Sequence, residues 1–280
     1  ASVLGSGGGG DPKVGRLLAK SMIQKYGPVN LISIDELQDD QYVVPVSGMG
    51  APTVSLEKLP SEIELTTPLQ ELERAFGKKA DVIIPIEVGG INSLYPVGAA
   101  AKLHLPILDA DAIGRAFPEA QMETFHLHGL EPEQVAVGDE KGNVALLKPI
   151  NAYWSEYMSR ALTVQMGGSA SVSDYFLAGK DVKGSVVNGT LSLAREIGEI
   201  LMHQEDYDDV FKALLDRLNG FELYDGKVTA VTRETKQGFN FGTAQIEGLN
   251  NYRGKTFSLE FQNETLVAKE GDEILASVPD

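Results

Sequence analysis

The sequence contains no cysteine, and that absence excludes several chemistries at once. Disulfide bonds, thiolate nucleophiles, iron–sulfur clusters and zinc sites built on thiolates all need that side chain. The sequence also lacks an apolar run approaching the roughly 20 residues of a membrane-spanning helix. We therefore expect a cytoplasmic protein that does not act in a membrane.

Positive charge is scarce. The 24 lysines and arginines face 40 aspartates and glutamates, so the net charge is −16, and both halves of the chain are acidic. Nucleic-acid binding depends on cations that neutralise phosphates, and an anionic membrane surface repels an acidic protein. We therefore expect neither as a partner. The 42% hydrophobic content is ordinary for a globular protein, and 280 residues can bury a sizeable core.

Strand-like and helix-like segments alternate through the first half of the chain. Such alternation predicts an α/β domain with a mostly parallel sheet and helices on its faces. A hairpin follows over 134–147, and then a helix from Asn151 to about Gly167 whose Trp154 and Tyr157 are expected to face inward. The expected strands of the first half are 29–34, 42–46, 82–86 and 107–108, and its expected helices are 12–26, 67–77 and 93–103.

The pattern changes after Gly167. Two helices are expected over 190–201 and 210–218, and short β runs separated by turns begin at Phe221. We therefore predict an α/β domain over 1–166 and a β-rich (α+β) domain over 167–280. The glycine loop starts almost at the first residue and the last residues stop in a β pattern, so we expect native residues to be missing from both ends.

A glycine-rich loop, Gly5-Ser6-Gly7-Gly8-Gly9-Gly10, precedes Asp11 and Pro12, which are typical of a helix N-cap and a first helical residue. Three of its glycines match G-x-G-x-x-G, and Asp35 stands where a ribose-binding acid belongs in a dinucleotide site. However, Asp11 puts a carboxylate beside the amides that would hold a pyrophosphate. The loop amides could equally hold an oxygen of a neutral ring, or the loop could be a tight turn only.

Carboxylates stand at the exit of the predicted strand 107–108. Asp109 and Asp111 are two residues apart, so on an extended strand they point the same way. Two carboxylates held close raise the pKa of one of them, which gives a proton acceptor and a proton donor near neutrality. Arg115 could pin one of them or bind the substrate. The same residues would also suit a helix cap and a surface ion pair.

Glu87 ends another apolar strand and is followed by Gly89, Gly90 and Asn92. The glycines would expose backbone amides beside the carboxylate, and Asn92 can pair with both the donor and the acceptor of a ring amide. Glu87 would lie beside Asp109 if their strands are neighbours. The alternative is an ordinary loop in which Asn92 or the next residue caps a helix.

His126 and His128 form an H-x-H pair, which on a strand would present both imidazoles on one side as metal ligands. A third ligand would have to be a carboxylate such as Glu123 or Asp109. H-x-H alone lacks the spacing of a recognised motif, so a divalent metal stays open and its identity unknown. No nicotinamide cofactor is expected.

Several segments, in order along nearly the whole chain, together resemble one family, the S-methyl thiohydantoin desulfurase domain proteins. The resembling segments are Gly7-Gly8-Gly9-Gly10-Asp11-Pro12, Gly48-Met49-Gly50-Ala51-Pro52, Pro85-Ile86-Glu87-Val88-Gly89-Gly90-Ile91-Asn92-Ser93, Asp109-Ala110-Asp111, Gly114-Arg115-Ala116-Phe117-Pro118, Met166-Gly167-Gly168-Ser169-Ala170, Thr190-Leu191-Ser192-Leu193-Ala194 and Phe261-Gln262-Asn263-Glu264. The resemblance implies an α/β domain followed by a β-rich domain, and an association with hydantoinase and oxoprolinase systems. The implied reaction removes sulfur from a cyclic thiohydantoin and leaves a hydantoin.

The leading hypothesis is therefore a bacterial enzyme that acts on a small heterocyclic substrate at the interface of two domains. A water would attack the carbon that bears sulfur, a carboxylate would take its proton, and the Gly7–Gly10 amides would hold a ring carbonyl. Arg115 and Asn92 would orient the ring. Two alternatives stay open: a nucleotide- or dinucleotide-binding protein that uses the Gly5–Gly10 loop, and a non-catalytic subunit of a hydantoinase-type system. A homo-oligomer is also open.

Overall fold

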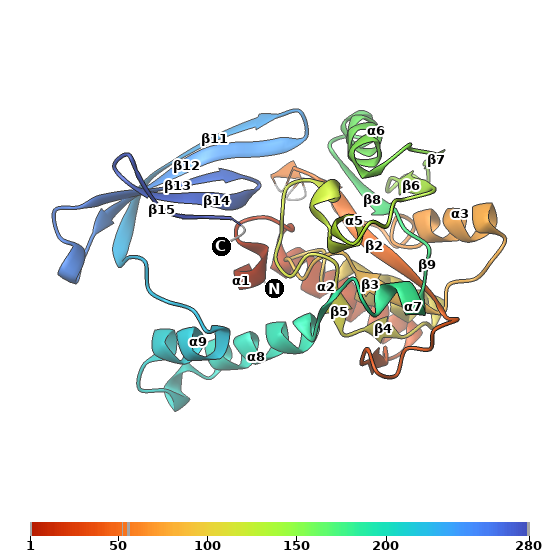
Figure 1. Ribbon diagram of the computed structural model, residues 1–280, viewed down its shortest axis with the longest axis horizontal. Coiled ribbons are helices and arrows are strands. Elements are labelled where there is room, and N and C mark those ends of the chain that lie inside the picture. The colour runs from red at the N-terminus through yellow and green to blue at the C-terminus, as the bar shows by residue number, and fades with distance from the viewer. Residues whose placement is uncertain (1, 52, 55–56, 279–280) are drawn as a thin grey trace.

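The computed structural model describes residues 2–51, 53–54 and 57–278, and its largest feature is a mixed sheet (Figure 1). In the described residues this sheet has eight strands in the order β1-β4-β3-β2-β8-β6-β7, and β9 also pairs with β2. The first four strands of this order run parallel, and the other pairings are antiparallel. The bounds are β1 Leu31–Ile32, β2 Tyr42–Gly50, β3 Val82–Pro85, β4 Ile107–Leu108, β6 Val135–Gly138, β7 Val144–Leu147, β8 Ser169–Ser173 and β9 Leu177–Ala178.

Helices alternate with the parallel strands, as the pattern predicted: α2 (Pro12–Tyr26) precedes β1, and α3 (Thr67–Phe76) and α4 (Tyr95–Leu103) join β2 to β3 and β3 to β4. Successive side chains of a strand point to opposite faces of the sheet, so strands covered on both faces are apolar throughout. One face buries Val44, Val46 and Ile83 against these helices. The other face buries Val43, Val82, Ile84 and Leu108 with Phe125 and Tyr175.

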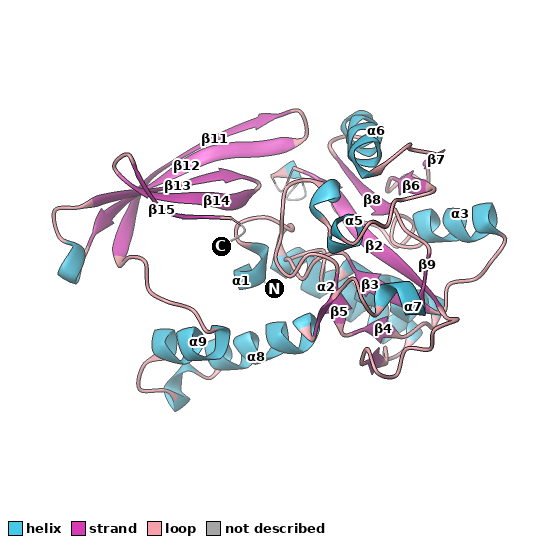
Figure 2. Ribbon diagram, viewed as in Figure 1, coloured by secondary structure: helices cyan, strands magenta, loops and turns pink. Residues whose placement is uncertain are grey.

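The C-terminal part is a five-stranded antiparallel sheet that stands to one side of the larger sheet, with two helices beneath it (Figure 2). The helices are α8 (Thr190–Met202) and α9 (Val210–Leu218), and the strands are β11 (Gly226–Lys236), β12 (Phe239–Gly248), β13 (Thr256–Gln262), β14 (Glu264–Glu270) and β15 (Glu273–Ser277). The predicted fold class, an α/β part and a β-rich part, is confirmed. None of the helices in the described ranges combines the length and the apolar character that crossing a bilayer requires.

Short elements fill the connections. β5 (Ala110–Asp111) pairs antiparallel with β10 (Val187–Asn188), and these lie outside the large sheet. The remaining short helices and turns are α1 (Ser2–Gly5), α5 (Thr124–Leu127), α7 (Gly179–Val182), η2 (Ala120–Met122), η3 (Gln204–Asp206) and η4 (Asn250–Tyr252). β8 and β9 follow residue 166 in the chain yet pair with β2 in the large sheet. The domain boundary between 166 and 167 stays a prediction.

The helix over 152–165 turns the opposite face inward from the one expected. In α6 (Ala152–Gln165) the aromatic side chains Trp154 and Tyr157 are 50% and 75% exposed. The buried face is mostly polar and comprises Ala152, Ser155, Glu156, Ser159, Arg160 and Thr163. Apolar periodicity selects the face of a helix that packs on a core, and here the inner face lines a polar cavity instead. The expectation that the aromatic face is buried was therefore wrong.

The start of α2 is capped as predicted. Asp11 Oδ1 accepts hydrogen bonds from the backbone N–H groups of Lys13 at 2.7 Å and Val14 at 3.3 Å, and Pro12 is the first helical residue. We expect Asp11→Ala to lower the free energy of unfolding by about 1 kcal/mol, because two amides of the first turn lose their acceptor. Asp11→Asn, which keeps an oxygen acceptor, should lose less. Equal denaturation midpoints for the alanine variant and the unmodified chain would contradict this role.

Candidate functional site

A cavity of about 100 Å³ lies where the ends of β2 and β3 meet the inner face of α6 and the turn between β13 and β14. It is smaller than the about 300–1,000 Å³ of typical ligand pockets, which favours a small ligand. Its described lining is rich in carboxyl groups and includes one cation. The acidic residues are Glu87, Glu119, Glu123, Glu156, Asp174 and Glu264, and the cation is Arg160.

Glu87 follows β3 and is held by Asn92. The Asn92 Nδ2 group donates to Glu87 Oε1 at 2.5 Å, while Asn92 Oδ1 accepts from the backbone N–H of Gly48 at 2.7 Å. Glu87 Oε2 is buried and has no partner among the described residues. Burial raises the pKa of Glu87 from its ordinary 4.5 to about 7, and the Asn92 hydrogen bond opposes that rise. Asn92 therefore positions Glu87, and its contact with a ring amide stays a prediction.

Two glycine loops pack directly on each other beside Glu87. The backbone oxygen of Gly9 accepts from the N–H groups of Ile91 at 2.5 Å and Asn92 at 3.3 Å. A Cβ at Gly9 would lie only 2.7 Å from Gly89 Cα and 2.9 Å from Glu87 Oε1, and Gly9 has a φ of +70°. Glycine is needed here because two backbones and a carboxylate approach one another closely.

Glu264 comes from the C-terminal sheet and lies against the neighbouring glycine. A Cβ at Gly8 would overlap the Glu264 carboxylate. The two consecutive glycines therefore leave space for the two carboxylates. Gly8 accommodates Glu264, and Gly9 accommodates Glu87. Burial, and then the charge of Glu87, raise the pKa of Glu264 from 4.5 to about 8. Glu264 Oε2 is also buried without a partner among the described residues.

Backbone contacts dock the C-terminal sheet on the glycine loop. The Thr265 N–H donates to the Ser6 oxygen at 2.7 Å, and Arg115 Nη2 donates to the Thr265 oxygen at 2.7 Å. Asn263, with a φ of +57°, turns the chain so that Glu264 enters the cavity. The Asn263 Oδ1 atom accepts a hydrogen bond of 2.8 Å from the Asn240 N–H, and Asn263 also lines the cavity.

Arg160 joins α6 to the loop at Pro118 and to the turn between β11 and β12. Its Nε pairs with Glu156, its Nη2 donates to the Pro118 oxygen at 3.1 Å, and its Nη1 donates to the Gly238 oxygen at 3.3 Å. The guanidinium also lies 4.0 Å from the centroid of the Phe239 ring. A planar fork with many donors suits such a set of partners, and a lysine would satisfy only part of it.

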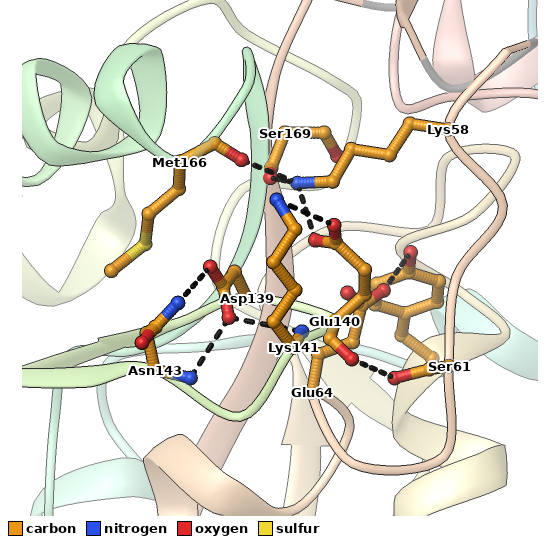
Figure 3. A network of polar contacts seen from close by, with 10 residues as sticks. Lys58, Ser61, Glu64, Asp139, Glu140, Lys141, Asn143, Met166 and Ser169 are labelled. Atoms are coloured by element: carbon orange, nitrogen blue, oxygen red, sulfur yellow. Dashed lines mark hydrogen bonds and ion pairs between the residues drawn. The ribbon is translucent and has the colours of Figure 1, made fainter.

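A second polar network supports the opposite wall. Lys58 Nζ donates to the backbone oxygens of Met166 at 2.7 Å and Ser169 at 2.5 Å, and it pairs with Glu140 at 2.7 Å (Figure 3). Ser169 lines the cavity. Glu64, shown beside this network in Figure 3, accepts a hydrogen bond of 3.0 Å from the Tyr95 hydroxyl. Burial raises the pKa of Glu64 to about 7.

Three residues assigned to catalysis from the sequence are absent from the described cavity lining: Asp109, Asp111 and Arg115. Asp109 accepts from the N–H of Ser192 at 3.0 Å and from its hydroxyl at 2.5 Å, near the start of α8. Asp111 accepts from two backbone N–H groups of the loop that follows it, at 3.0 and 2.5 Å. β3 and β4 are neighbours as supposed, but Asp109 is bonded to Ser192 and Asp111 Oδ1 to the following loop, while Asp111 Oδ2 is buried without a partner among the described residues. Their catalytic roles stay predictions.

The glycines assigned to substrate binding have different environments. Gly9 and Gly10 line the cavity, whereas Gly7 and Gly8 face the β13–β14 segment at Asn263 and Glu264. Gly89 and Gly90 pack against the first loop, with a Cβ at Gly90 overlapping the oxygen of Gly10. Asp11 occupies the amides at the start of α2, and carboxylates surround the loop, so these features oppose a pyrophosphate there.

The H-x-H segment lies on α5 and its C-cap, not on the expected strand, so the two imidazoles do not share one side as they would on a strand. His126 Nδ1 lies 3.0 Å from Glu131 Oε1, and His128 Nδ1 lies 2.8 Å from the Thr124 oxygen. Within the described ranges, no group of three or more His, Asp or Glu side chains is arranged to hold a metal ion.

Sequence reasoning gave no role to five charged residues that line the cavity: Glu119, Glu156, Arg160, Asp174 and Glu264. The sequence contains a pattern that could have identified two of them. Glu156 and Arg160 are four residues apart on the same helix face as three small hydroxyl side chains, which is a buried polar stripe opposite the aromatic one. Glu119 and Asp174 stand on loops and Glu264 is the first residue of β14, and no periodicity marks these positions.

Comparisons with known proteins give a family for this arrangement. The S-Me-THD-like N-terminal domain matches residues 1–149, and the S-Me-THD-like C-terminal domain matches residues 150–280. A protein from Chromobacterium violaceum, known from an X-ray crystal structure, shares 26% identity at a TM-score of 0.78, over 100% of this chain and 76% of that one. No curated protein matches this chain. The resemblance seen in the sequence is therefore confirmed, and the chain belongs to the S-Me-THD-like family.

Proposed function

We propose that this chain hydrolytically removes sulfur from a small thiohydantoin or S-methyl thiohydantoin and leaves a hydantoin. The observation that carries the proposal is the pair Glu87 and Glu264, which come from the two parts of the fold and meet in one cavity against consecutive glycines. Each has a buried oxygen without a partner among the described residues. The family supports the class of substrate.

The reaction balances with water as the second substrate. Glu87 takes a proton from water as its oxygen adds to the carbon that bears sulfur, and the carbon–sulfur bond then breaks. Glu264 donates a proton to the departing sulfur. From an S-methyl substrate the oxygen stays on the carbon, one hydrogen ends on the ring nitrogen, and the other leaves with methanethiol. From a thiohydantoin both hydrogens leave with the sulfur as hydrogen sulfide.

The two protonation states fit these roles. Glu87, with a pKa of about 7, is substantially ionised near neutrality and can accept a proton. Glu264, with a pKa of about 8, is mostly protonated there and can donate one. Burial raises both pKa values into the neutral range, so near pH 7 one carboxyl group of this coupled pair can be ionised while the other is protonated.

The pH profile follows from this assignment. We expect kcat/KM to rise through about pH 7 as Glu87 ionises and to fall through about pH 8 as Glu264 loses its proton. The two apparent values belong to the coupled pair, so the profile should be a narrow bell. A profile that keeps rising above this range would remove Glu264 as the acid.

Thiol release is the experiment that tests the proposal. The chain has no cysteine, so a chromogenic thiol reagent gives no signal from the protein itself. Purified protein with an S-methyl thiohydantoin should release one thiol per ring consumed, and Glu87→Gln should abolish most of that release. An unmodified protein that binds the ring but releases no thiol would favour the alternative of a non-catalytic subunit.

Gly8→Ala should displace the Glu264 carboxylate without unfolding the chain. The added methyl group meets the end of a flexible side chain, and Gly8 does not need a positive φ, so the fold should tolerate it. The Glu264 carboxylate must move, and we expect turnover to fall on the order of tenfold or more, since the proton donor is displaced. Gly198→Ala, where a Cβ meets nothing within 4 Å, is the matched control. Equal turnover in both variants would contradict the role of Glu264.

A further inference from the structure

Two carboxyl groups on another wall of the cavity take no part in the proposed reaction. Glu123 follows η2 and Asp174 follows β8, and both line the cavity with exposed fractions of 2% and 4%. The two carboxyl groups lie close enough for a mutual hydrogen bond, which shifts the pKa of each. Such a bond between two carboxyl groups needs a proton, because two carboxylates can only accept.

The buried oxygens of this pair point to the same conclusion. Among the described residues Glu123 Oε2 and Asp174 Oδ1 have no hydrogen-bond donor. One shared proton supplies the missing donor and leaves the pair with a single negative charge, as for other carboxyl groups that cannot both ionise at close range. Burial and the charge of Asp174 hold the pKa of Glu123 well above 4.5, which is consistent with the shared proton.

The residues around the pair leave its carboxyl oxygens available as hydrogen-bond acceptors. Glu156 and Glu87 also line the cavity, and the charge of each raises the pKa of Glu123. The Tyr175 hydroxyl is buried near the pair. Arg160, the cation in the cavity lining, is already paired with Glu156. A ligand that enters therefore meets acceptor oxygens on this wall and gains most from bringing an N–H donor.

We propose that Glu123 and Asp174 share one proton and accept a hydrogen bond from a ring N–H, which selects cyclic amides and imides with that N–H free. This proposal rests on the proposed function for one point only, namely that the ligand is a hydantoin-type ring. It is independent of Glu87 and Glu264, because it concerns binding and not the release of sulfur.

Binding of hydantoin tests the recognition of the N–H. Calorimetric titration of the purified chain with hydantoin should show binding, and methylation of one ring nitrogen should weaken it at least tenfold, whereas methylation of the other should not. A site built to bond an N–H discriminates strongly against an analogue that lacks it. No binding of hydantoin, or equal affinity for both methylated rings and hydantoin, would overturn the proposal.

Glu123→Gln tests the shared proton. The glutamine amide supplies a permanent donor to Asp174, so hydantoin affinity should stay within about threefold, whereas Glu123→Ala should lose it. Because the folded pKa of Glu123 is raised, its stabilisation is present at low pH and is lost as pH rises through that pKa. The melting temperature should therefore fall less steeply with rising pH in Glu123→Gln and Asp174→Asn than in the unmodified chain. Identical pH profiles for all three would overturn the shared proton.

The two proposals can fail separately. If hydantoin binds with the expected N–H preference but no thiol is released from the S-methyl substrate, the binding assignment stands and the desulfurisation is wrong. If thiol is released equally well from both N-methylated substrates, the desulfurisation stands and the role of Glu123 and Asp174 is wrong.

Discussion

Replacing Glu87 with glutamine should lower turnover by about 10²- to 10⁴-fold while the fold is retained. The variant keeps the oxygen that accepts from Asn92 Nδ2, so the geometry of the loop is preserved. It removes the group that takes the proton from water, and loss of a general base has an effect of this size. The measurement is steady-state thiol release together with the melting temperature.

The stability of this variant provides the control. Burial raises the pKa of Glu87 to about 7, so the folded chain binds this proton more tightly than the unfolded chain does. The resulting stabilisation is lost as pH rises through about 7. Glu87→Gln, which is never charged, should therefore be at least as stable as the unmodified chain at about pH 8. A variant that loses turnover and stability together would place Glu87 in the scaffold and not in the chemistry.

Arg160→Ala should have the largest effect on stability, about 3–5 kcal/mol. The change leaves Glu156 buried without its partner, and an uncompensated buried charge has a cost of this size. It also removes the bonds to the Pro118 and Gly238 oxygens that join α6 to its neighbours. Denaturant unfolding measures the change.

Two further variants distinguish the loss of the positive charge of Arg160 from the loss of its hydrogen bonds to the backbone oxygens. Arg160→Lys keeps a cation for Glu156 but loses the fork that reaches both backbone oxygens, so an intermediate loss is expected. The double variant Glu156→Gln with Arg160→Met removes both charges and should recover part of the stability lost in Arg160→Ala. If Arg160→Ala unfolds at the same denaturant concentration as the unmodified chain, the ion pair does not stabilise this fold.

The fold was predictable where local chemistry decides it. The Asp11 cap, the Pro12 start and the apolar strands 42–46 and 82–86 all depend on nearest neighbours and on burial of both sheet faces. The α6 helix was also found, but its orientation was not. The periodicity of the sequence distinguishes an apolar and a polar face of this helix. It cannot show that the polar face is the buried one, because that depends on a cavity formed by distant segments.

The site was only partly predictable for a related reason. Glu87 and the glycines were identified because they sit together in one short segment or loop. Glu264 reaches the cavity only through the turn at Asn263, and Asp174 only through the pairing of β8 with β2. Such contacts join segments far apart in the chain, so no local pattern reveals them. Asp109 and Asp111 show the converse. Local spacing suggested a pair, but Asp109 bonds to the distant Ser192, and Asp111 bonds to the amides of the loop that follows it.

Isotope labelling tests the central claim, that the cavity carboxylates direct water to the carbon that bears sulfur. The purified chain is incubated with an S-methyl thiohydantoin in ¹⁸O-labelled water, and the hydantoin formed is analysed by mass spectrometry with Glu87→Gln as the blank. We predict one labelled oxygen per hydantoin, at the carbon that carried sulfur, appearing in step with the released thiol. Hydantoin without the label, or label incorporated equally fast by Glu87→Gln, would contradict the account.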